Sequence, residues 1–198
     1  MDVGRASRRT SNGDAQPSLM PMSLASPFVL RSATPDDAAV ILAGIRGLAE
    51  YEKLSHEVVA TEALIRETLF GPRPAAEVIL AYHGEDAAGF ALFFHNYSTF
   101  LARPGVYLED LFVFPAYRGS GLGKLLLARL ARLALDRGCA RLEWSVLDWN
   151  ADAIRFYESV GARAMSEWTV NRVTGEALHA LAAASPATGA VGAARSRQ

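Results

Sequence analysis

The chain has little of what a disulfide-stabilised, metal-binding or membrane-spanning protein needs. Its 198 residues include a single cysteine, Cys139, so no intramolecular disulfide can form and no cysteine cluster can hold a structural metal. The four histidines are far apart and lack the spacing of metal ligands. No apolar run approaches the roughly 18 residues that a membrane-spanning helix needs. We therefore expect no metal site, no membrane contact and a reducing, cytoplasmic location.

An excess of charge of one sign is also missing. The chain has 20 basic and 21 acidic residues, which gives no support to a protein that binds nucleic acid through phosphate contacts. Residues 1–27 and 183–198 hold five of the basic and two of the acidic residues, so the segment between them has 15 and 19, a net charge of −4. A mildly acidic domain suits a cationic substrate.

Both ends of the chain lack apolar periodicity. Residues 1–27 are rich in Ser, Pro, Gly and Arg, and residues 183–198 in Ala, Gly and Ser. Neither segment can bury enough apolar surface to offset its ordering entropy. We expect a disordered tail at each end and one globular domain over residues 28–182.

Strand and helix patterns alternate between the tails. Strands are predicted over residues 28–32, 77–82, 89–94, 106–114, 141–147 and 164–173, and helices over 38–49, 61–69, 124–137 and 151–160. Thr34-Pro35-Asp36-Asp37 has the cap, the proline and the acids of a helix N-terminus. Antiparallel strands followed by strand, helix, strand and helix indicate a mixed α/β sheet.

A glycine-rich turn lies between the strand at 106–114 and the next helix. Its sequence is Arg118-Gly-Ser-Gly121-Leu-Gly123-Lys124. Glycines let backbone N–H groups converge without interference from Cβ atoms, and the helix N-terminus adds partial positive charge. The turn therefore suits a diphosphate, although a glycine turn that binds nothing would look similar.

Two familiar phosphate motifs do not fit this turn. A P-loop needs Ser or Thr after its lysine, whereas Leu125 follows Lys124. The dinucleotide fingerprint G-x-G-x-x-G needs a glycine where Lys124 or Leu126 stands.

The pattern that does fit is Arg118-x-x-Gly121-x-Gly123, which resembles the acetyl-CoA pyrophosphate loop of the GCN5-related N-acetyltransferases (GNAT family). A second element of that family follows in the right order, as Asn150-Ala-Asp-Ala153-Ile-Arg-Phe-Tyr157 and then Gly161. The resemblance extends from Phe28 to near Leu181.

Four short segments are similar to the diamine (spermidine/spermine) branch of this family. They are Tyr107-Leu-Glu-Asp110, Tyr117-Arg-Gly119, Asp148-Trp-Asn150 and Ala49-Glu-Tyr51-Glu52. Tyr97-Ser-Thr99 is more similar to the thialysine-acetylating members of the branch. Phe100 stands where the branch has a tryptophan, and part of its acidic run is missing after Met165. These departures leave the acceptor amine open.

The resemblance implies the GNAT fold, an α+β arrangement in which helices flank a mostly antiparallel sheet and a splayed pair of parallel strands binds acetyl-CoA. Backbone groups of Leu111, Phe112 and Val113 are expected to pair with the pantetheine arm. The other residues expected to contact the cofactor are Arg118, Gly119, Ser120, Gly121, Leu122, Gly123, Lys124, Asn150, Ala153 and Tyr157.

The resemblance also implies two catalytic residues. Tyr157 is the expected general acid, because a phenol of pKa about 10 can protonate a departing thiolate whose thiol has a pKa of about 8.5. Glu109 is the expected carboxylate that binds the acceptor ammonium and draws off its proton through water. As alternatives, Tyr157 could be a core ring and Asn150 a helix cap.

The acceptor site is expected to include Tyr51, Glu52, Glu109, Glu143, Trp144 and Ser145. Glu52 could equally be a solvated charge at a helix end. The implied function is acetyl transfer from acetyl-CoA to a primary amine of a small polycationic or amino-acid-like molecule, in a homodimer. Alternatives are a protein N-terminus, a protein lysine or an aminoglycoside as acceptor, and a non-catalytic acyl-CoA sensor.

Overall fold

The structure is a computed structural model that describes residues 26–185, so the predicted tails at 1–27 and 183–198 lie for the most part outside the described residues. The chain divides into two compact units, one ending at Ser145 and the other beginning at Val146, and each is described by itself. No helix among the described residues is long and apolar enough to cross a membrane.

The first unit is built on one five-stranded sheet with the strand order β1-β2-β3-β4-β5. The first four strands pair antiparallel, and β4 pairs parallel with β5. The predicted mixed, mostly antiparallel sheet is therefore confirmed. Its strands are β1 (Phe28–Ser32), β2 (Glu77–His83), β3 (Asp86–Ser98), β4 (Arg103–Val113) and β5 (Leu142–Trp144).

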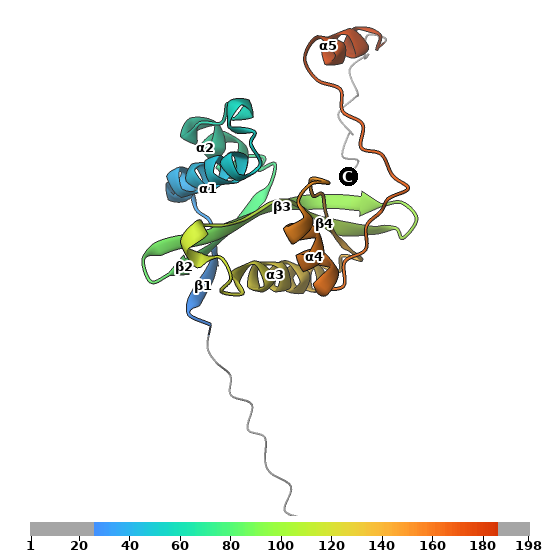
Figure 1. Ribbon diagram of the computed structural model, residues 1–198. Helices are drawn as coiled ribbons and strands as arrows, with labels where there is room; N and C mark the ends of the chain where they lie inside the picture. The colour runs from blue at the N-terminus through green and yellow to red at the C-terminus, as the bar shows by residue number, and fades with distance from the viewer. Residues whose placement is uncertain (1–25, 186–198) are drawn as a thin grey trace, which may run out of the picture. The chain divides into compact units, whose positions relative to one another are not determined.

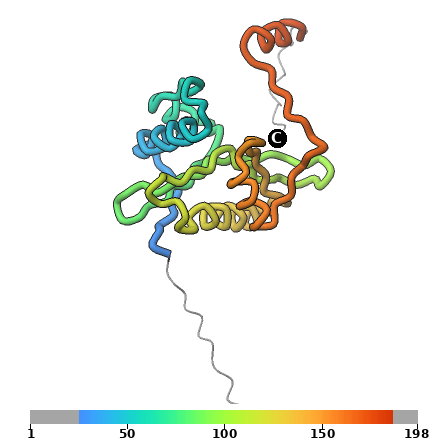
Figure 2. Tube along the Cα trace, viewed as in Figure 1, coloured from blue at the N-terminus to red at the C-terminus, as the bar shows by residue number. Residues whose placement is uncertain are grey.

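Helices cover both faces of this sheet. Figures 1 and 2 show α1 (Ala38–Tyr51) and α2 (Glu62–Phe70) over one face and α3 (Leu122–Asp136) over the other. Short 3₁₀ turns precede α1, α2 and α3, at Pro35–Asp37, Ser55–Glu57 and Pro115–Tyr117. The side chain of Thr61, where the predicted helix over 61–69 begins, caps α2 by accepting the N–H of Leu64 at 3.2 Å.

The core under α1 is aromatic and tightly packed. Phe90 and Phe112 are buried there among apolar residues of α1, α2 and β2. A Cβ atom on Gly44 would lie 2.5 Å from the Phe90 ring, and one on Gly47 would lie 2.7 Å from the Phe112 ring. These two glycines therefore let α1 approach the sheet to ring-contact distance.

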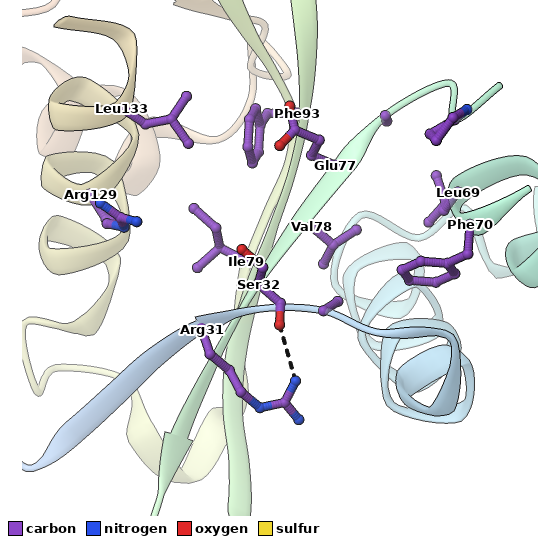
Figure 3. A pocket seen from close by; sticks show the side chains of 13 residues that line it. Arg31, Ser32, Leu69, Phe70, Glu77, Val78, Ile79, Phe93, Arg129 and Leu133 are labelled. Carbon is purple, nitrogen blue, oxygen red and sulfur yellow. Dashed lines mark hydrogen bonds between the residues drawn. The ribbon is translucent and has the colours of Figure 1, made fainter. Parts of the chain in front are cut away.

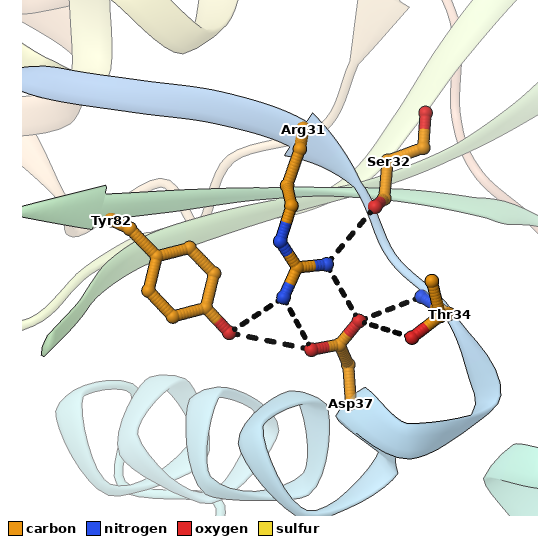
Figure 4. Close-up of polar contacts among 5 residues, drawn as sticks. All are labelled: Arg31, Ser32, Thr34, Asp37 and Tyr82. Carbon is orange, nitrogen blue, oxygen red and sulfur yellow. Dashed lines mark hydrogen bonds and ion pairs between the residues drawn. The ribbon is translucent and has the colours of Figure 1, made fainter. Parts of the chain in front are cut away.

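An ion-pair network fixes the start of α1 to the sheet (Figure 4). Both oxygens of the buried Asp37 carboxylate accept hydrogen bonds from the Arg31 guanidinium of β1, at 2.7 Å each. The N–H and hydroxyl of Thr34 donate to the same carboxylate at 2.7 and 2.9 Å. The Tyr82 hydroxyl of β2 donates to it at 3.3 Å. Asp37 therefore connects two strands to the helix start, and Arg31 holds its pKa well below the ordinary value.

The second unit contains α4 (Ala151–Ser159) and α5 (Gly175–Ala183). The prediction of a strand over residues 164–173 is wrong, because these residues form no strand and their side chains are exposed. A strand needs a partner to satisfy its backbone groups, and no described strand pairs with this segment. The strand predicted over 141–147 is also shorter than expected, since β5 ends at Trp144.

The Asp37 network predicts a pH-dependent loss of stability. Replacing Asp37 with Asn should lower the free energy of unfolding at pH 7 by about 1–2 kcal/mol, a discounted value because the Arg31 side chain is 42% exposed. Because the folded-state pKa of Asp37 is depressed, this stabilisation is complete above its unfolded pKa of about 3.9 and disappears as the pH falls below it. Urea unfolding of the wild-type and variant proteins at pH 7 and at pH 2.5 measures the free energy of unfolding at each pH.

The matched control for this variant is Asp136→Asn. Asp136 pairs with Arg132 within α3, where both side chains are largely exposed. Such pairs contribute about 0.5 kcal/mol or less. An Asp37→Asn effect no larger than that of the control, or one that persists undiminished at pH 2.5, would contradict the anchoring role of Asp37.

Candidate functional site

The glycine turn lies between the end of β4 and the start of α3. Gly119 and Gly121 have φ angles of +75° and +84°, in the left-handed region that favours glycine, and a Cβ atom on either would meet nothing within 4 Å. Gly121 is the N-cap of α3 and no side chain caps this helix. The first N–H groups of a helix have no intrahelical partner, so the first N–H groups of α3 can donate hydrogen bonds to a bound anion.

Contacts made by the Ser120 and Tyr117 side chains fix the position of this turn. The Ser120 hydroxyl donates to the carbonyl of Tyr117 at 2.6 Å, and the Tyr117 hydroxyl donates to Asp86 at 3.3 Å. The Tyr117 ring also lies 6.1 Å from the Phe28 ring and 5.7 Å from the His83 ring. The open backbone, the uncapped helix and these anchors fit a diphosphate group.

Strand β4 contains a β-bulge at Glu109. Leu92 of β3 pairs with Asp110 and the next residue, Phe93, pairs with Leu108, so Glu109 has no partner on β3. On the other side, the pairing of β4 with β5 ends at Leu108. Beyond the bulge, the described part of β4 pairs with β3 alone. The splayed parallel pair predicted from the sequence is present, and Leu111, Phe112 and Val113 lie in the part of β4 that β5 leaves unpaired.

Asp110, which follows the bulge residue, interacts electrostatically with two other carboxylates. The pKa of Asp110 is raised to about 6, first by burial and then by the negative charges of Glu109 and Glu52. Burial also raises the pKa of Glu52, the C-cap residue of α1. Asp110 is therefore within electrostatic range of two predicted site residues, Glu109 and Glu52.

Sequence reasoning did not include Asp110 in the site. Strand alternation places neighbouring residues on opposite faces, which separates Asp110 from Glu109 in a regular strand. The bulge breaks that alternation. The available signal was the pair of adjacent acids in a strand that otherwise carries apolar residues.

The end of α1 is shaped by a left-handed residue. Lys53 has a φ angle of +63°. The N–H of Leu54 donates to the carbonyl of Ala49 at 2.8 Å, and the N–H of Lys53 donates to the carbonyl of Glu50 at 3.1 Å. This is a Schellman-type C-terminus formed without glycine. It fixes the direction in which the chain leaves Tyr51 and Glu52.

The predicted acceptor residues on and after β5 already have partners in the first unit. The Glu143 carboxylate lies 2.7 Å from Nε of Arg141 and accepts from the Asn96 side-chain amide at 2.7 Å. The hydroxyls of Ser145 and Tyr107 lie 2.7 Å apart, and Trp144 is half-buried. Because its charge is balanced by Arg141, Glu143 is less available to an ammonium than the three carboxylates at the bulge.

The remaining predicted residues lie on α4, in the second unit. The side-chain oxygen of the buried Asn150 accepts the N–H of Ala153 at 3.2 Å, so Asn150 is the N-cap of α4. Tyr157 is half-buried, and its ring lies 5.3 Å from that of Phe156. The helix-cap alternative for Asn150 is thus confirmed, and its contact with a cofactor stays a prediction.

Figure 3 shows a cavity of about 200 Å³ elsewhere in the first unit. Ile79 and Phe93 line it on the side of α3, where Arg129 and Leu133 lie, and Val78 lines it on the side of α2. None of the predicted site residues lines this cavity. Among the described residues, no three His, Cys, Asp or Glu side chains are grouped to hold a metal ion.

Known proteins resemble this chain in sequence and in fold. The L-ornithine N5-acetyltransferase NATA1 of Arabidopsis thaliana is 37% identical, over 77% of this chain and 86% of its own length. The thialysine N-epsilon-acetyltransferase of Mus musculus is 40% identical, over 77% and 96% respectively. The solved structure of an integron cassette protein of V. cholerae matches with a TM-score of 0.68 and 26% identity, over 79% of this chain and 98% of that chain.

The family comparison agrees with the motifs. The model of the acetyltransferase (GNAT) family matches residues 45–162, which include the glycine turn, the β4 bulge and α4. The predicted resemblance to the diamine and thialysine branch is confirmed by the relatives named above. The chain therefore belongs to the GNAT acetyltransferase family and is an N-acetyltransferase.

Proposed function

We propose that this N-acetyltransferase transfers the acetyl group of acetyl-CoA to a primary amine of a small diamine, polyamine or amino-acid-like molecule of the thialysine or ornithine type. The observation that carries the proposal is the group of three carboxylates, Glu52, Glu109 and Asp110, at the β4 bulge. The names of the relatives support this class of acceptor.

An alkylammonium acceptor must lose a proton before it can react. Its pKa is near 10.4, so deprotonation at pH 7 costs about 4–5 kcal/mol. The three carboxylates attract the ammonium, and Glu109, which is exposed, takes its proton through water. The neutral nitrogen then forms a bond to the thioester carbonyl carbon.

The donor contributes the activated acyl group, and residues of this chain bind and polarise it. The glycine turn and the uncapped N-terminus of α3 hold the pyrophosphate through main-chain N–H groups. Backbone groups of Leu111, Phe112 and Val113 hold the pantetheine arm, and an N–H in this stretch stabilises the oxyanion. When the carbon–sulfur bond breaks, Tyr157 gives its proton to the CoA thiolate, and the second proton released by the substrate nitrogen restores the phenol as the neutral amide forms.

The direct test is CoA thiol release with purified protein, acetyl-CoA and a panel of amines. We expect turnover with at least one of spermidine, putrescine, thialysine, lysine and ornithine. Turnover confined to a peptide N-terminus, a peptide lysine or an aminoglycoside would overturn the small-amine proposal. The cytoplasmic location expected from the sequence remains a prediction.

The glycine turn should be required for donor binding. Acetyl-CoA at about 100 times its Kd should stabilise the native protein by about 2.7 kcal/mol, which raises Tm. Gly121→Val places a β-branched residue at a φ angle of +84° and should abolish this rise. The matched control is Gly84→Val in the β2–β3 turn, where φ is +61°. The control should keep the rise in Tm, and an equal loss in both variants would remove the turn from donor binding.

The two catalytic residues should respond differently to isosteric substitution. Tyr157→Phe removes only a hydroxyl and should lower kcat by roughly 10²–10⁴-fold while acetyl-CoA still binds. Glu109→Gln removes a charge, so we expect KM for the amine to rise and kcat to fall, with recovery at higher pH where more amine is neutral. Steady-state pH–rate profiles measure both effects.

Tyr97→Phe and Glu85→Gln are the matched controls for these variants. Both residues are exposed, in the β3 end and in the β2–β3 turn respectively. Tyr157→Phe with wild-type kcat under rate-limiting chemistry would assign the acid to another group. Glu109→Gln with an unchanged profile would remove that carboxylate from catalysis.

We also propose that two copies of the chain form a homodimer through residues 164–181. This segment exposes large apolar side chains, with Trp168 71% and Val170 79% exposed. An exposed apolar segment of this kind is stabilised when a partner chain covers it. Most homo-oligomers are two-fold dimers. A strand supplied by a second copy would satisfy the backbone of the segment that pairs with no described strand.

Light scattering at micromolar concentration should give about twice the chain mass of 21.3 kDa. The double variant Trp168→Glu, Val170→Lys should give a monomer, because it places charges in the apolar contact. Glu85→Lys, a charge reversal at an exposed position of the β2–β3 turn outside this segment, is the control and should remain dimeric. A monomeric wild-type protein would contradict the proposal.

A further inference from the structure

The side chain of Arg118, in the glycine turn, lies against the end of α1 and the core of β4. Its guanidinium carbon lies 5.0 Å from the centroid of the Tyr51 ring and 5.5 Å from that of the Phe112 ring. Its Nε–H donates to the carbonyl of Val113 at 3.1 Å. The guanidinium therefore contacts the last residue of α1 and the end of β4 together.

These contacts occupy the planar side chain of Arg118. A guanidinium stacks on aromatic rings and keeps a fixed hydrogen-bonding direction, which the flexible ammonium of lysine cannot reproduce. The Phe112 ring cannot move freely beneath it, because the ring is buried and lies against Gly47 of α1. The backbone of Arg118 is part of the turn proposed to bind the donor, whereas its side chain packs against the end of α1.

We propose that Arg118 is a positioning residue that couples the two substrates: occupation of the glycine turn fixes Arg118, which in turn fixes Tyr51 and Glu52 in the acceptor wall. The inference rests on the proposed function. Donor and amine then bind with positive cooperativity, because whichever ligand binds first orders the contact that the other needs.

The test is a binding cycle that needs no turnover. Isothermal titration measures the Kd of an accepted amine with and without saturating CoA, which fills the donor site without an acyl group to transfer. From the usual strength of a cation–π contact, we expect CoA to tighten amine binding by roughly 3–10-fold in the wild-type protein. The amine should tighten CoA binding by the same factor.

Arg118→Lys keeps the charge and removes the stacking, so it should reduce this coupling factor to about 1–2. Tyr51→Leu should reduce it equally, the double variant should add no further loss, and Tyr51→Phe should retain it because the ring remains. In steady state, Arg118→Lys should raise KM for the amine more than it lowers kcat. The matched control is Arg129→Lys, an exchange on α3 at an arginine that is exposed.

The possible results separate a failure of this inference from a failure of the proposed function. A rise in the Kd of CoA with an unchanged coupling factor in Arg118→Lys would make Arg118 a phosphate ligand and overturn the inference. Wild-type protein that turns over an amine without any coupling would overturn this inference alone. Wild-type protein that turns over no amine would overturn the proposed function, and this inference with it.

Discussion

At Glu109, strand β4 has one residue more than the strand it pairs with, and three properties of the candidate site follow from that bulge. The bulge bends β4 away from β5, whose pairing ends at Leu108, and so leaves Leu111 to Val113 with one free edge. It interrupts strand alternation at Glu109, whose charge adds to burial in raising the pKa of the neighbouring Asp110. It also lies one short strand segment before the glycine turn, so that the residues proposed to bind the donor and the acceptor lie in one continuous stretch of chain.

The position of α1 completes the acceptor side. Asp37 fixes the start of this helix to β1 and β2, and Gly44 and Gly47 allow it to lie close against the aromatic core. The far end of the helix then presents Tyr51 to Arg118 and Glu52 to Asp110. A helix held firmly at its start and along its length can place two residues at its end without their own strong anchors.

The predictions that succeeded depended on local patterns. The turn between β4 and α3, the helix over residues 61–69 and the neighbouring strands β2 and β3 are specified by residues a few positions apart, and they were confirmed. The strand predicted over 164–173 was wrong because an apolar alternating segment becomes a strand only where another strand pairs with it. Helix α5 (Gly175–Ala183) was not predicted, because no helix or strand was assigned to the domain after residue 173.

The missed features of the site depend on contacts distant in sequence. Arg118 lies in a loop and Tyr51 lies at the end of a helix much earlier in the chain. No spacing in the sequence therefore predicts their contact. Asp110 was hidden by the bulge, which depends on the register between β3 and β4. Glu143 looked available in sequence, whereas Arg141 and Asn96 already bind it.

The most direct test of the central claim is proton release when the amine binds. A cation placed among Glu52, Glu109 and Asp110 must lower the pKa of Asp110, which is about 6 in the free protein. Titration calorimetry at pH 6 in two buffers of different ionisation enthalpy should therefore show release of about half a proton per amine bound. The release should vanish in Asp110→Asn. Amine binding without proton release, or with the same release in Asp110→Asn, would contradict the account.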